Sequence, residues 1–151
     1  MKKLSKYFVI NLFFLGALSF GFVAEEPTKI SWETLRDVTF KKKWSAEESM
    51  FILYPTFGQK IVGLQGKEVV LTGYMIPVDV DANMYVLSAN PYSSCFFCGQ
   101  AGPESVVQVK FKKTTKRFNT DDRITVKGTL KLNADDINEL NYIMANADLI
   151  Q

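Results

Sequence analysis

Two cysteines provide the clearest opportunity for chemistry in this chain of 151 residues. Cys95 and Cys98 are its only cysteines, and it has no histidine. Two thiols at this C-x-x-C spacing can close a small disulfide, exchange disulfides with another protein, or bind a soft metal ion. The lack of histidine removes the commonest nitrogen ligand and the usual general base. The spacing therefore marks a possible site and leaves three kinds of chemistry open.

A local disulfide is the first interpretation of the pair, because an exported protein meets oxidising conditions. The ring that such a bridge closes is very small, so it removes little entropy from the unfolded chain. In this interpretation the protein is a non-enzymatic interaction module with a stapled loop. Tyr92, Phe96 and Phe97 of the same loop then either form an apolar patch for a partner or fold back against the barrel.

A metal site is the second interpretation, with Cu(I) or Zn(II) as the ion, because both bind thiolates. Cys95 and Cys98 are the soft ligands, and Glu104 follows in the same loop as an oxygen ligand. Zinc prefers four ligands, so two chains would pool cysteines or oxygen ligands would complete the shell, whereas Cu(I) accepts fewer ligands. The sequence offers these further ligands: Asp79, Asp81, Met75 and Met84.

A thiol–disulfide oxidoreductase is the third interpretation. Such enzymes place the first cysteine at the N-terminus of a helix, which lowers the pKa of its thiol. Gly99 and Pro103 closely follow the pair and disfavour a helix there. Enzymatic activity therefore stays open, and the sequence favours a non-enzymatic binding role. No catalytic residue is assigned.

The first residues predict export. Lys2, Lys3 and Lys6 precede a short apolar run that ends in small residues, the pattern of a signal peptide at 1–24. The run is short for a membrane span, which needs about 20 apolar residues. We therefore expect a periplasmic or secreted protein that contacts the membrane only if this segment is not cleaved. The remainder, 25–151, is expected to form a single domain.

Charge limits the class of partner. The formal net charge is +2 for the whole chain and becomes −1 once the three N-terminal lysines are removed. A nearly neutral protein lacks the broad basic surface of a nucleic-acid-binding protein. The expected partner is instead an unknown envelope protein or a metal-handling protein.

The pattern of apolar residues predicts a mainly β fold with minor α structure. Five strands are expected, and a small five-stranded OB-like barrel with short N-terminal helical segments is the favoured arrangement. An open antiparallel sheet covered by those helices is the alternative. Gly73 is expected to mark a bend or bulge in the first strand. The expected segments are a helix beginning at Ser31, a helical turn in 41–50, a loop or strand end in 51–57, and strands at 67–78, 84–89, 105–112, 123–132 and 142–150.

Several short motifs resemble a family of secreted bacterial proteins of unknown function. They are Trp32…Leu35, Pro55-x-Phe57, Leu64-x-Gly66-Lys67-x-Val69 and Gly73-Tyr74-Met75-Ile76-Pro77. In that family a hairpin and a proline-rich, cysteine-containing loop follow the last motif. The family loop pairs its cysteine with a histidine, whereas this chain has Cys98 and no histidine. The resemblance implies no activity.

Overall fold

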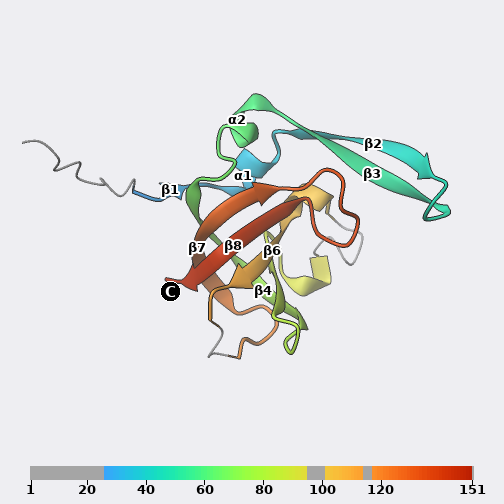
Figure 1. The fold of residues 1–151 in the computed structure, drawn as a ribbon. Coiled ribbons are helices and arrows are strands. Elements are labelled where there is room, and N and C mark those ends of the chain that lie inside the picture. The colour runs from blue at the N-terminus through green and yellow to red at the C-terminus, as the bar shows by residue number, and fades with distance from the viewer. Residues whose placement is uncertain (1–25, 95–100, 114–116, 151) are drawn as a thin grey trace, which may run out of the picture.

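The computed structural model describes residues 26–94, 101–113 and 117–150. It is mainly β and consists of a closed five-stranded barrel, a separate two-stranded hairpin and a few short helices. Figure 1 shows the hairpin extending away from the barrel. The prediction of a small OB-like barrel is thus confirmed, and the open sheet is wrong.

The barrel closes because its first and fourth strands pair. We number the five strands along the chain. Around the barrel they then lie in the order first, second, third, fifth and fourth, which is the OB arrangement. The third and fifth strands run parallel, and the other neighbours run antiparallel. The strands are β4 (Glu68–Asp79), β5 (Met84–Ser88), β6 (Val106–Phe111), β7 (Arg123–Leu132) and β8 (Tyr142–Leu149).

Alternation of side chains builds the core inside this barrel. Along β4, the alternate residues Val69, Leu71, Gly73 and Met75 are buried, and the residues between them are partly exposed. A second, smaller cluster lies apart from this core and consists of Ile76, Val86 and Val106, with Leu140 packed against them. The loop that contains Leu140 therefore adds a cover to the barrel wall.

The segment before the barrel is held to it by specific contacts. β1 (Thr28–Lys29) pairs in parallel with β4, and α1 (Trp32–Leu35) follows with Ser31 as its N-cap. Leu35 is fully buried in the main core. The Trp32 indole N–H donates to the Thr72 carbonyl at 2.8 Å. The predicted helix start at Ser31 is confirmed, whereas the short parallel strand was not foreseen.

Gly73 does not mark the bulge that the sequence suggested. Its strand pairs with β7 in continuous register from Glu68 to Tyr74, and the irregularity in β4 lies between Pro77 and Asp79. A Cβ at position 73 would lie 2.6 Å from the Ser88 carbonyl oxygen and 2.8 Å from the Trp32 ring. The glycine is therefore required for the close approach of Trp32.

We expect Gly73→Ala to lower the free energy of unfolding by about 1–3 kcal/mol, because the added methyl overpacks this contact. Urea denaturation measures the change. Gly63→Ala is the matched control, since a Cβ there is no closer than 3.3 Å to its neighbours. Equal stability of the two variants would contradict this reading of Gly73.

The charged segment expected to hold a helical turn is instead part of a hairpin. β2 (Val38–Ser45) and β3 (Met50–Phe57) form eight antiparallel pairs, so the prediction of a helical turn in 41–50 is wrong. The segment 51–57, expected to be a loop or strand end, is a full strand. Lysines of β2 lie over aromatic rings of β3: Lys42 Nζ is 4.8 Å from the centre of the Phe51 ring. These cross-strand contacts stabilise an extended conformation for a run that looks only polar in the sequence.

The base of the hairpin is fixed to the barrel. Asp37, just before β2, accepts hydrogen bonds from the backbone N–H groups of Lys60 and Ile61 at the start of α2 (Gln59–Val62). Phe57 at the end of β3 packs edge-to-face on Tyr142, with ring centres 5.6 Å apart. The hairpin therefore emerges from the barrel in a defined direction.

Candidate functional site

The cysteine loop, residues 89–105, joins β5 to β6. Cys95, Phe96, Phe97 and Cys98 lie outside the described residues. The two described ends of the loop are held together, because the Ala89 N–H donates to the Ser105 carbonyl at 2.9 Å. Each end also carries one short helical turn. These turns are η2 (Tyr92–Ser94) and η4 (Pro103–Ser105).

Tyr92 lies at the surface of the described part of the loop. Its side chain is 48% exposed. Its backbone N–H donates to a carboxylate oxygen of Asp121 at 2.8 Å, which ties this end of the loop to the segment before β7. Tyr92 does not line the cavity that contains Glu104.

Glu104 lies at the other end of the loop, in a small polar cavity. The cavity measures about 220 Å³, and Trp32, Arg36 and Ala101 also line it. Among the described residues, the Glu104 carboxylate has neither a hydrogen bond nor an ion pair, whereas Arg36 is paired with Glu33. The two carboxylate oxygens of Glu104 lie close to Gly102: a Cβ added to this glycine would be 2.2 and 2.5 Å from them. The cavity thus holds one carboxylate that is free to bind something else.

The charge of Glu104 also acts on the barrel interior. Burial raises the pKa of Tyr142, and the carboxylates of Glu104 and Asp37 raise it further. The Tyr142 hydroxyl is buried and donates to the Leu35 carbonyl at 2.7 Å. The raised pKa keeps the Tyr142 phenol protonated, so its hydroxyl can keep donating to the Leu35 carbonyl.

Two of the four other ligands suggested by the sequence, Met75 and Asp79, have structural roles. Met75 is fully buried in the barrel core. Asp79 accepts a hydrogen bond from the Ala82 N–H in the β4–β5 turn. Within ranges 26–94, 101–113 and 117–150, no three of the residues Cys, Asp and Glu lie close enough together to hold a metal ion. Of the named oxygen ligands, Glu104 is the one at the cysteine loop.

Sequence reasoning missed a second concave surface. A groove of about 350 Å³ runs between β3 and the β7–β8 loop, residues 133–141. Its lining includes Phe51, Leu53, Asp135 and Asp136. The available signal was the uncharged run Met50–Tyr54, which follows the three lysines of β2.

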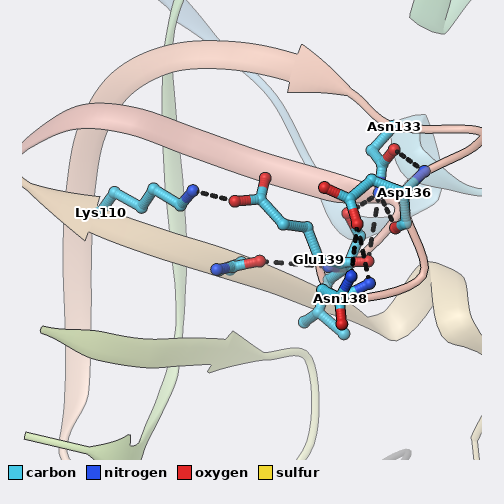
Figure 2. A network of polar contacts seen from close by, with 7 residues as sticks. Lys110, Asn133, Asp136, Asn138 and Glu139 are labelled. Atoms are coloured by element: carbon cyan, nitrogen blue, oxygen red, sulfur yellow. Dashed lines mark hydrogen bonds and ion pairs between the residues drawn. The ribbon is translucent and has the colours of Figure 1, made fainter. Parts of the chain in front are cut away.

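The β7–β8 loop that forms the far wall of this groove is internally braced. The Asn133 side chain accepts from the Asp136 N–H at 2.9 Å and donates to the Asp136 and Glu139 carbonyls at 2.7 and 3.1 Å. Lys110 forms an ion pair with Glu139. Figure 2 shows these side chains converging on the loop. The wall is therefore preorganised.

Fold and surfaces together define an OB-like barrel with an appended hairpin, with one concave surface at the end of the cysteine loop and another between β3 and the β7–β8 loop. The chain belongs to the family described as "Protein of unknown function (DUF3299)", whose model matches residues 59–151. The β2–β3 hairpin precedes the matched region.

A solved structure supports the fold. The crystal structure of a DUF3299 family protein from Pseudomonas aeruginosa PAO1 matches with a TM-score of 0.52 and 17% identity. The match covers 83% of this chain and 97% of that chain, and at this identity it shows the fold alone. No curated protein matches the chain. The expected family of unknown function is thus confirmed, and the cysteine-loop part of the resemblance stays a prediction.

No helix in the described part of the chain is both long and apolar enough to cross a membrane.

Proposed function

We propose that this protein is an exported, non-enzymatic binding protein that holds a soft metal ion, Cu(I) or Zn(II), in its cysteine loop. Cys95 and Cys98 supply thiolates, and Glu104 supplies an oxygen ligand. The observation that carries the proposal is the unpaired Glu104 carboxylate in a cavity at the base of this loop.

Chain connectivity makes this ligand set feasible. Cys98 precedes Ala101, a residue of the cavity wall, by three positions. Three residues span at most about 11 Å, so the length of the chain allows Cys98 to supply a ligand at the cavity. Soft sulfur ligands select Cu(I) or Zn(II) over Ca(II) and Mg(II).

The two ions are expected to behave differently. A zinc site with two thiolates and one carboxylate lacks a fourth protein ligand, so zinc either retains water or draws in a second chain. Cu(I) is satisfied by fewer and softer ligands. Zinc binding should therefore depend on Glu104 more strongly than Cu(I) binding does.

Competition against a chelator tests the proposal on reduced protein purified from the periplasm, with intact mass recording the loss of about 21–24 residues on export. We expect the double variant Cys95→Ser, Cys98→Ser to lose binding of both ions. Glu104→Gln should lower zinc affinity at least about tenfold and change Cu(I) affinity little. Glu48→Gln is the matched control, because Glu48 is an exposed carboxylate in the β2–β3 turn.

The outcomes separate the alternatives. The double variant should keep its fold, with a loss of less than about 2 kcal/mol, because the pair closes a short loop. Binding that is equal in wild type and double variant, or absent in both, would refute the metal site. Oxidised cysteines without metal would instead support an interaction module with a stapled loop, and a reactive thiol of low pKa would support an oxidoreductase.

A further inference from the structure

The outer edge of β3 is available for pairing. Within the described residues, β2 is the only strand that pairs with β3. In an antiparallel pair, alternate residues of a strand direct their N–H and C=O groups away from their partner. A hairpin of two strands is also marginally stable alone, and a third strand stabilises it. The hairpin is therefore a sheet with room for one more strand.

The groove beside the hairpin follows this edge. It is lined by five consecutive residues of β3, Met50 to Tyr54. Successive side chains of a strand point to opposite faces, so a groove that contacts all five must run along the edge between the faces. Five residues extend about 17 Å. Pro55, which has no N–H, ends the run of possible donors.

The two edges of the hairpin differ in protection. The β2 strand carries Lys41, Lys42 and Lys43, all exposed, and lysines on an edge discourage pairing with other strands. The β3 run Met50–Tyr54 has no charged residue. Phe51 and Leu53 are nevertheless 56% and 44% exposed. The unprotected edge is thus the one that faces the groove.

The opposite wall carries negative charge next to an exposed apolar residue. Asp135 and Asp136 line the groove, and Ile137 of the same wall is 47% exposed. Glu139 is neutralised by Lys110, but the Asp135 carboxylate has no partner among the described residues. The wall therefore favours a ligand that brings both a cation and apolar side chains.

We propose that the groove binds an extended segment of a partner protein, in which apolar residues alternate with lysine or arginine, as a third strand on β3. Backbone hydrogen bonds to β3 provide binding, and the acidic wall provides selectivity. The proposal does not depend on the proposed metal site, although Pro103 of the cysteine loop also lines the groove.

A second copy of this chain fits the groove less well. Its own β3 run is uncharged and would leave Asp135 without a cation. Its β2 edge has lysines, but β2-to-β3 pairing is head-to-tail, so each added copy would leave another β3 edge open. The unpaired Asp135 and the open-ended assembly of copies therefore both favour a different protein as the source of the strand.

Fluorescence anisotropy with synthetic peptides tests the proposal on the wild-type protein. The probe is a fluorescein-labelled peptide of about seven residues that alternates lysine and valine. We expect it to bind at least tenfold more tightly than the same peptide with glutamate in place of lysine. N-methylation of alternate residues along one peptide edge should weaken binding about tenfold, and methylation along the other edge should not. Equal binding of the lysine and glutamate peptides, or no effect from either methylation, would overturn the proposal.

Protein variants locate the binding. Asp135→Lys should remove most of the preference for the lysine peptide, and Asp81→Lys, at an exposed aspartate of the β4–β5 turn, should leave it intact. Equal effects of the two substitutions would place the charge selectivity elsewhere and overturn the proposal. Size-exclusion chromatography accompanies the titration. A dimer that forms without peptide and excludes it would assign the groove to a second copy instead.

Discussion

Replacing Leu35 with alanine is expected to lower the free energy of unfolding by about 2–5 kcal/mol, the usual range for a large-to-small change in a core. Leu35 is fully buried in the main core cluster. It belongs to a helix of four residues, too short to be stable without this anchor. Urea denaturation followed by far-UV circular dichroism measures the loss.

Val62→Ala is the matched control for Leu35→Ala. Val62 also ends a four-residue helix, but it is 52% exposed. Its truncation should change stability by less than about 0.5 kcal/mol. If both variants lost the same free energy, the anchoring role of Leu35 would be wrong.

Stability should also fall as pH rises above about 10, the ordinary pKa of a tyrosine. Burial raises the pKa of Tyr142 in the folded protein, so the native state holds its phenol proton more tightly than the unfolded chain does. The stabilisation is fully present below the unfolded pKa and is lost as pH increases from there towards the folded pKa. Denaturant midpoints between about pH 8 and 11 measure this slope.

Tyr142→Phe separates titration from packing. At neutral pH the variant should lose about 1–3 kcal/mol, because the Leu35 carbonyl loses its donor while the ring remains. Above about pH 10 it should lack the part of the alkaline decline that comes from this tyrosine. Parallel curves for wild type and Tyr142→Phe would show that another group causes the decline.

The barrel could be predicted because each strand carries its own signal. Val107, Val109 and Phe111 alternate with polar residues, and β7 occupies the predicted span 123–132. All five barrel strands were found to within two residues at each end. Closure could be anticipated as well, since five strands in a chain of this size have few other ways to hide their edges.

The hairpin could not be predicted because its stabilising contacts cross between strands. Lys43 looks solvated in the sequence, yet its Nζ lies 5.3 Å from the centre of the Tyr54 ring. The role of Gly73 was misread for the same reason: the ring that requires a glycine there comes from Trp32, about forty residues earlier. Long-range contacts of this kind leave no local pattern.

The sequence pointed to the cysteine loop as a candidate site but not to the groove along β3. The sequence named Glu104 as an oxygen ligand of the cysteine loop, which stays a prediction, and the structure adds the cavity around it. The groove along β3 was invisible, because it depends on two loops and a hairpin edge that meet only in the folded chain.

The order of strands in the barrel has a consequence for how the protein folds. β8, the last strand in the chain, lies between β6 and β7, and the pairing of Leu71 with Val126 closes the barrel across 55 positions. Such distant pairings slow folding, because loop-closure entropy is lost before the contacts form. During synthesis from the N-terminus, β4, β5 and β6 therefore cannot be part of a complete barrel until β8 has been made. The β2–β3 hairpin, whose pairs are local, can form well before then.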